Sequence, residues 1–326
     1  MPAADDTLFA SAKLLDTTKF REALTAGASV SAQWDGLSIL EVALDSAIMD
    51  HENPASVPKC ILYFQAALAA GTPLPEASIK LLFRAAEFNS IELLRVLEGA
   101  GLDMLSQHPL DNKNALLHAV WNTADASHTK EPCAVDYFLS IGIPVDSQNS
   151  MGNTALRIAV VGGKYHYAHK LLLAGADLNL KSLNNETPME VFWRLTYTGS
   201  KQYHLLSLLL QKGGDANSTD ALKNKWTGLM LAATKGDLAS VRFLLAFGAN
   251  PLLRCPSGFT ARQHLQKLRT VVGPVKENRT ELDELLRTAE ASWEVQTGID
   301  SKPNALSMPP EALTMPAKDR RGFDIL

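Results

Sequence analysis

The sequence predicts an all-α fold, a solenoid of about seven to eight helix-turn-helix units. Two recurring signatures and their regular spacing predict it. The first is an apolar stripe at helical spacing that ends at a glycine, and the second is a short polar turn that leads into a further apolar helix. Because two antiparallel helices cannot bury their apolar faces alone, each unit needs its neighbours to complete a core.

The glycine of the first signature fits a helix C-terminus, where a left-handed residue is favoured. In one clear copy Leu244 and Leu245 precede Gly248. The glycines of this series are Gly27, Gly71, Gly101, Gly142, Gly175, Gly213 and Gly248, with a mean spacing near 37 residues. A tandem array therefore accounts for most of the chain.

The second signature resembles a known family. Residues 152–159 read GNTALRIA and residues 185–191 read NETPMEV, and both are similar to the ankyrin opening G-x-T-P-L-H-x-A. Residues 36–43, 227–233 and 258–261 are similar to the same opening, and residues 171–179 resemble the ankyrin segment L-L-x-x-G-A-D-V-N. The resemblance implies stacked helix pairs whose concave side binds another protein.

We expect the divergent ankyrin array to occupy residues 1–265, a C-terminal capping helix residues 266–295, and a flexible tail residues 296–326. The alternative for residues 320–326 is a short docking motif. Three units run long, with insertions expected at residues 45–59, 121–132 and 195–203. Because a surface loop lengthens at little cost, these insertions are natural places for function.

The composition excludes several classes of protein. The chain of 326 residues is 46% hydrophobic and has a formal net charge of −4, so it lacks the positive charge of a general nucleic-acid binder. The three cysteines lie far apart and predict neither a disulfide framework nor a zinc finger. No secretory leader is visible, and the richest apolar run, residues 61–70, is too short to span a membrane. We expect a cytoplasmic protein.

Residues that could support catalysis are few. His166 and His169 could share a helix face, but a metal site needs three or four ligands. Residues 162–164, Gly-Gly-Lys, lack the spacing of a phosphate loop, and residues 50–52, Asp-His-Glu, fit a solvated charge cluster. Cys60 lies on an apolar stripe. We therefore expect no enzyme, no catalytic residue, no cofactor and no metal; the alternative of another class is a metal-dependent enzyme or ligand binder.

The resemblance implies partner contacts at the turns and at the ends of the inner helices. The residues at these positions are Trp34, Asp35, Asp45, Glu87, Phe88, Lys113, Trp121, Asn122, Met151, Asn153, Asn184, Glu186, Arg194, Lys223, Asn224, Trp226, Thr234 and Lys235. Trp34, Trp121 and Trp226 are the expected anchors, because exposed tryptophan is typical of binding hot spots. The alternative is that each packs against a neighbouring turn or insertion. Trp193 is expected to face the core.

The most concrete function that the sequence favours is a stoichiometric inhibitor or immunity protein that neutralises a toxin or enzyme. The irregular units resemble, in architecture alone, ankyrin-like chains encoded beside bacterial secreted toxins. The alternative is an adaptor or a secreted effector that engages a host protein. We expect a monomer that forms a heteromeric complex.

Overall fold

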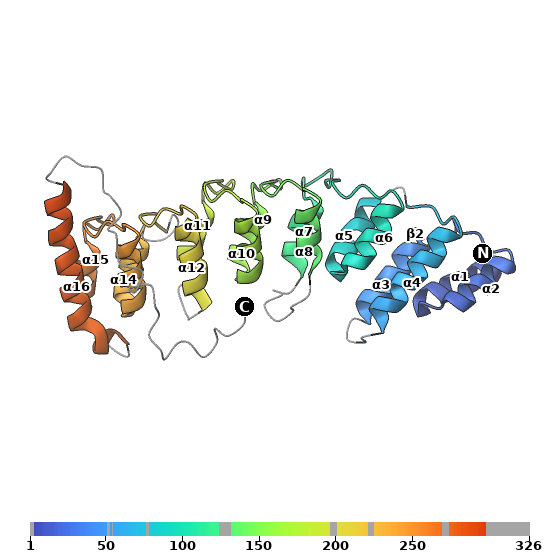
Figure 1. Cartoon of the computed structure of the whole chain (residues 1–326), viewed down its shortest axis with the longest axis horizontal. Helices are drawn as coiled ribbons and strands as arrows, with labels where there is room; N and C mark the ends of the chain where they lie inside the picture. The colour runs from blue at the N-terminus through green and yellow to red at the C-terminus, as the bar shows by residue number, and fades with distance from the viewer. Residues whose placement is uncertain are drawn as a thin grey trace. The chain divides into compact units, whose positions relative to one another are not determined.

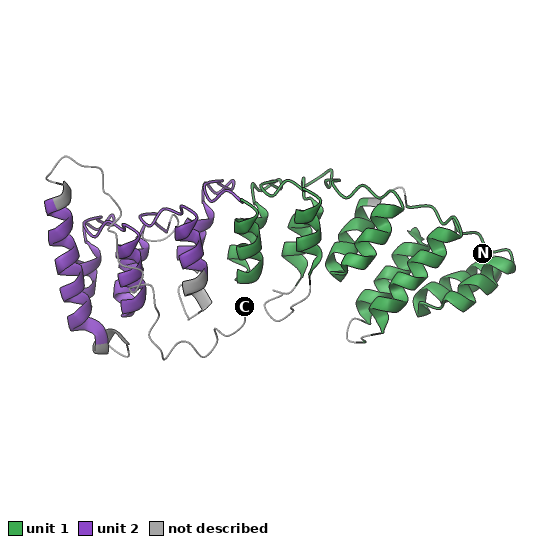
Figure 2. Cartoon of the chain, viewed as in Figure 1, with its two compact units in different colours: residues 1–175 green, residues 176–326 purple. Residues whose placement is uncertain are grey.

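The computed structural model describes residues 3–50, 53, 55–75, 78–123, 132–195, 201–220, 225–268 and 274–297. These residues form helices joined by short turns (Figure 1), so the all-α prediction is confirmed. The chain divides into two compact units, residues 1–175 (unit 1) and residues 176–326 (unit 2), which are green and purple in Figure 2. None of the described helices is both long enough and apolar enough to cross a membrane.

Unit 1 is a stack of helix pairs with one short hairpin. Its helices are α1 (Ala3–Leu14), α2 (Thr17–Thr25), α3 (Ile39–Met49), α4 (Ser56–Ala69), α5 (Ser78–Phe88), α6 (Ile91–Gly99), α7 (Ala115–Asn122), α8 (Ala134–Ser140), α9 (Ala155–Val161) and α10 (Tyr165–Leu173), and its strands are β1 (Gln33–Trp34) and β2 (Leu37–Ser38). The strands pair antiparallel. The first helices of the pairs, α1, α3, α5, α7 and α9, contact one another in succession, and so do the second helices α2, α4, α6 and α8.

Unit 2 continues the pattern of helix pairs. Its helices are α11 (Pro188–Leu195), α12 (Lys201–Gln211), α13 (Gly228–Lys235), α14 (Leu238–Ala246), α15 (Ala261–Lys267) and α16 (Pro274–Thr297). α13 contacts α14 and α15, and α16 lies against α13, α14 and α15. α16 spans most of residues 266–295, where the sequence suggests a capping helix, while residues 298–326 lie outside the described part of the chain.

The predicted apolar stripes form the core of each unit. Every glycine of the series has a positive φ, from 77° at Gly142 to 93° at Gly213, as a left-handed helix end requires. Trp193 is 2% exposed, as expected, and its ring lies so close to Gly228 that a Cβ there would come within 2.4 Å of it. Glycine is therefore the residue that lets α13 begin against this tryptophan.

One predicted insertion is wrong. Residues 45–59 are mostly helical, because α3 continues to Met49 and α4 begins at Ser56. The sequence analysis ended the first helix of this pair too early, since an ankyrin helix of ordinary length would stop near Asp45. Residues 124–131 and 196–200, in the other two predicted insertions, lie outside the described residues.

Candidate partner-binding surface

A common turn geometry precedes most first helices. Each turn ends at a residue whose side chain accepts a backbone N–H of the helix and so caps it: Ser38, Asn114, Thr154, Thr187, Thr227 and Thr260. Two residues before each cap the backbone φ is positive, at Gly36, Asn112, Gly152, Asn185, Lys225 and Gly258. Earlier residues form the exposed tip of the turn, while the residue just before the cap returns towards the helices.

This register corrects two predicted partner contacts. Asn153 and Glu186 each stand directly before a cap, and their exposed fractions are 9% and 0%. Asn153 Oδ1 accepts a hydrogen bond from Arg157 Nη1 at 2.7 Å. Neither side chain is available to a partner. Sequence reasoning treated all residues of a turn alike, and only the tip residues are accessible.

The tips of two neighbouring turns in unit 1 carry exposed apolar side chains. Leu110 is 85% exposed and the predicted contact Met151 is 61% exposed. The Ser150 N–H donates to the carbonyl of Asp111 at 2.7 Å, so the two tips lie side by side. Lys113 Nζ lies 3.5 Å from Asp111 Oδ2, which leaves the charges at this tip balanced.

Two of the three predicted tryptophan anchors pack against neighbouring residues of their own unit. The Trp34 ring lies 5.6 Å from the Phe9 ring and 4.5 Å from Lys13 Nζ, and it is 36% exposed. The half-buried Trp226 ring lies 4.4 Å from the His264 ring. The alternative interpretation, packing against a neighbour, therefore describes both residues better than the anchor interpretation does.

The other predicted contacts differ in accessibility. The exposed ones are Asp35, Asn122, Asn184 and Lys235, and the half-buried ones are Asp45, Glu87, Phe88, Lys113 and Thr234. Lys223, Asn224 and the side chain of Arg194 lie outside the described residues. The accessible residues thus gather at turn tips and at helix ends, which are separate rows of the surface.

The C-terminal ends of four successive first helices in unit 1 carry apolar residues. We call this row, Met49, Phe88, Trp121 and Val161, the helix-end stripe. Met49, Trp121 and Val161 are 84%, 57% and 41% exposed, and Phe88 is half-buried. Each ends its helix except Trp121, which is the last residue but one. Their helices α3, α5, α7 and α9 contact one another in turn and stand side by side in Figure 1.

A row of polar side chains, the polar ladder, lies along three of these helices. Arg84 Nη2 on α5 lies 2.9 Å from Asp45 Oδ1 on α3, and Arg84 Nη1 lies 3.9 Å from Glu87 Oε2. Glu87 Oε2 is 4.0 Å from His118 Nε2 on α7, which accepts a hydrogen bond from Asn122 Nδ2 at 2.8 Å. Because residues four apart share a helix face, the polar ladder follows the faces that end in the helix-end stripe.

His118 is held neutral within the polar ladder. Burial, assisted by the nearby Lys113 and Arg84 charges, lowers the pKa of His118 to about 4. Its ring stacks on Phe83, with ring centroids 4.5 Å apart. Since the imidazole is uncharged at neutral pH, the polar ladder contains two carboxylates and one guanidinium, a local charge of −1.

Lys164 fixes the end of α7 from the start of α10. Its Nζ donates to the carbonyls of Val120, Trp121 and Thr123 at 2.6, 2.7 and 2.7 Å. Thr123 Oγ1 donates to Tyr167 Oη at 2.9 Å. A cation is favoured at a helix C-terminus, where carbonyls lack helical partners. The Trp121 backbone is therefore held in place while its side chain stays exposed.

Sequence reasoning missed Met49, Arg84, His118, Val161 and Lys164. Met49 was assigned to an insertion. Val161 precedes the glycines at 162–163, so it could have been found by the same helix-end position that identified Trp121. No sequence pattern connects the three polar residues, because each pairs with a residue of another helix or of the adjoining turn.

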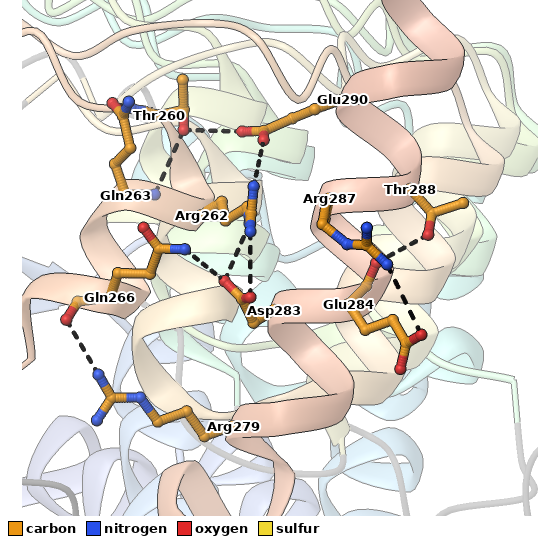
Figure 3. A network of polar contacts seen from close by, with 10 residues as sticks. All are labelled: Thr260, Arg262, Gln263, Gln266, Arg279, Asp283, Glu284, Arg287, Thr288 and Glu290. Carbon is orange, nitrogen blue, oxygen red and sulfur yellow. Dashed lines mark hydrogen bonds and ion pairs between the residues drawn. The ribbon is translucent and has the colours of Figure 1, made fainter.

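The last helix pair of unit 2 is joined by a different polar network (Figure 3). Arg262 Nε and Nη2 donate to the two oxygens of Asp283 at 3.0 and 3.2 Å, and Arg262 Nη1 lies 3.6 Å from Glu290 Oε2. Thr260 Oγ1 donates to Glu290 and Gln266 Nε2 donates to Asp283. The hydrogen bond from Arg262 holds the pKa of Asp283 below its usual value. These contacts attach α16 to α15.

Among the residues that the structure describes, His166 and His169 of the metal-dependent alternative have no third ligand beside them. His166 is half-buried and His169 is exposed on α10, and residues 51–52 lie outside the described residues. Where the structure describes the chain, no group of three or more His, Cys, Asp or Glu could hold a metal ion. Burial raises the pKa of Cys60 to about 12, so its sulfur remains a protonated, unreactive thiol.

Comparison with known families identifies the repeats. Residues 82–182 match three copies of the ankyrin repeat, and residues 224–255 match a further copy. An ankyrin repeat protein of Rickettsia bellii is 27% identical over 162 residues, which are 48% of this chain and 46% of that protein. The chain thus spans about half the length of this curated relative.

Solved structures show the same kind of fold. The ankyrin repeat domain of Bcl-3, a member of the IkappaB protein family, superposes with a TM-score of 0.52 at 18% identity, covering 78% of this chain and 100% of that one. A chain from the complex of the Bdellovibrio bacteriovorus endopeptidase Bd0816 with the immunity protein Bd3460 gives a TM-score of 0.45 at 22% identity, covering 64% and 97%. The likeness to the Bcl-3 domain supports the ankyrin fold.

Proposed function

Since the chain is an ankyrin-repeat protein, we propose that it is a stoichiometric inhibitor, which binds and neutralises a toxin or enzyme and has no catalytic activity of its own. Ankyrin arrays are protein-binding scaffolds, because their stacked units present extended surfaces to partners. The observation that carries the proposal is the helix-end stripe, in which Trp121 is 57% exposed on a backbone that Lys164 fixes.

The rigidity of this surface suits an inhibitor. Ordering side chains and loops on binding costs about 0.5–1.5 kcal/mol for each immobilised side chain, and a surface ordered beforehand avoids much of that cost. The polar ladder and Lys164 supply this order in unit 1, since Arg84 joins α5 to α3 and Lys164 holds the end of α7. We expect the inhibitor to act as a monomer that forms a heteromeric complex.

The test is capture followed by an activity assay. The tagged full chain is purified from its source cells, and proteins that co-elute at equal stoichiometry are identified and assayed with increasing amounts of the chain. We expect one partner whose activity falls to zero at a one-to-one ratio. A partner that keeps its full activity when saturated overturns the inhibitor proposal.

Two variants sharpen the test. Trp121→Ala should weaken inhibition by about 1–4 kcal/mol, whereas Leu62→Ala, at a similarly exposed position on α4, should leave it unchanged. Deleting residues 303–326 should also leave inhibition unchanged. If the captured partner requires residues 303–326 and not Trp121, the chain is an adaptor that uses its tail.

A further inference from the structure

The two units carry opposite net charges. Unit 1 contains 19 Asp and Glu against 12 Lys and Arg, a net charge of −7, whereas unit 2 contains 16 against 19, a net charge of +3. The helix-end stripe lies wholly in the negative unit. The polar ladder beside it accounts for −1 of that total, and the Lys164 ammonium lies at the Trp121 carbonyl. A partner segment that contacts this stripe is therefore favoured if it is positively charged.

The spacing of the helix-end stripe selects the conformation of that segment. Packed helices lie about 8–10 Å apart, so successive members of the stripe are separated by about that distance. Seven residues of an α-helix rise about 10.5 Å and return to nearly the same face, which matches the spacing. In a strand three residues rise about 10 Å, but the third side chain points to the opposite face.

We infer that the helix-end stripe binds a basic amphipathic helix of the partner, about 20 residues long, with apolar side chains at heptad spacing. This inference rests on the proposed function and specifies which part of the partner the inhibitor holds. Met49, Phe88, Trp121 and Val161 each meet one apolar residue of that helix. Lysine or arginine residues on its flanks lie near Asp45 and Glu87, whose carboxylates outnumber the Arg84 guanidinium.

The test uses peptides in place of the partner. The probe is a helical peptide of roughly 22 residues with leucine at every seventh position and lysine and alanine elsewhere. In the first control peptide every lysine is replaced by glutamate, and in the second every leucine is replaced by serine. Affinity for the full chain is measured by fluorescence anisotropy at low salt and at about 0.5 M salt.

We expect the lysine peptide to bind, the serine peptide not to bind, and the glutamate peptide to bind at least about tenfold more weakly. Salt should weaken the binding of the lysine peptide. Trp121→Ala should weaken the binding of the lysine peptide at least about tenfold. Leu62→Ala, which changes a similarly exposed residue on α4, should leave the binding unchanged. Equal binding of the lysine and glutamate peptides, or equal effects of the two variants, overturns the inference.

The inference and the proposed function fail in different ways. If the captured partner is inhibited and depends on Trp121, but the lysine peptide does not bind, the inference is wrong and the inhibitor proposal stands. If the lysine peptide binds through Trp121 but every captured partner stays active, the inhibitor proposal is wrong and the inference stands.

Discussion

The polar ladder of unit 1 and the polar network of the last helix pair of unit 2 use charged side chains for different purposes. In unit 2, Arg262 joins the two helices of one pair through hydrogen bonds to Asp283 and an ion pair with Glu290. In unit 1, Arg84 joins helices of different pairs, and apolar side chains remain exposed one turn further along. The first arrangement completes a structure. The second fixes a surface that has contacts left to make.

The largest effect should come from residues of the core that each unit has. Leu172→Ala in unit 1 and Leu244→Ala in unit 2 should each lower the free energy of unfolding by roughly 2–5 kcal/mol, because each leaves a cavity at a buried position. Chemical denaturation followed by circular dichroism measures the loss. The adjacent Leu173 and Leu245 are more exposed, so their alanine variants are matched controls with smaller losses. Equal losses within a pair would contradict this assignment.

Mild acid should destabilise unit 1 through His118, and unit 2 through His264, whose pKa burial also lowers. The folded pKa of His118, about 4, lies below the unfolded value of about 6.5, so its contribution is present above pH 6.5 and is lost as the pH falls towards 4. The loss at pH 4 is about 3 kcal/mol. The lowered pKa of Asp283 acts only below about pH 4.

Denaturation of the full chain at each pH from 7 to about 4 measures this loss, and hydrogen exchange locates it in α7. His118→Gln removes this titrating group, so the stability of the variant should vary less with pH than that of the original chain. If the variant keeps the slope of the original chain, another group causes the acid sensitivity.

Breaking the network of unit 2 should have a smaller effect. Arg262→Met should lower the free energy of unfolding by about 1 kcal/mol, because the paired groups are partly solvated, and should speed hydrogen exchange in α16. Binding of the lysine peptide should not change. Arg287→Met is the control, since its pair with Glu284 is 3.9 Å long and largely exposed. Weaker binding of the lysine peptide to the Arg262→Met variant would show that the two regions are coupled.

The smallest effect on stability should come from the polar ladder. Arg84→Met should change the free energy of unfolding by about 0.5 kcal/mol or less, because its side chain is 45% exposed. It removes the positive charge of the polar ladder, so the lysine peptide should bind roughly twofold more tightly at low salt. Weaker binding of the lysine peptide to this variant would instead show that Arg84 positions neighbouring side chains. In that case the charge of the polar ladder would not determine the preference for a basic partner.

The repeats could be predicted from the sequence because their backbone geometry requires particular residue types at single positions. A left-handed helix end favours glycine, and a capped first turn favours threonine, serine or asparagine. The helix end at Gly175 and the helix start at Thr154 can therefore be recognised from the sequence. The burial of Glu186 could not be predicted from the sequence, because it depends on how one turn packs against the next. The polar ladder was also hidden, since Arg84 meets Asp45 across 39 positions of the sequence.

The contacts of Lys164 determine how short a fragment of unit 1 can be. A fragment that ended after α8 would keep the Trp121 side chain but would lose the donor for three carbonyl groups at the end of α7. The repeat that contains α7 is therefore not an interchangeable module, because the end of this helix is completed by a residue of the next repeat. The shortest fragment that presents the whole helix-end stripe in its native form must extend through α10, to about Gly175.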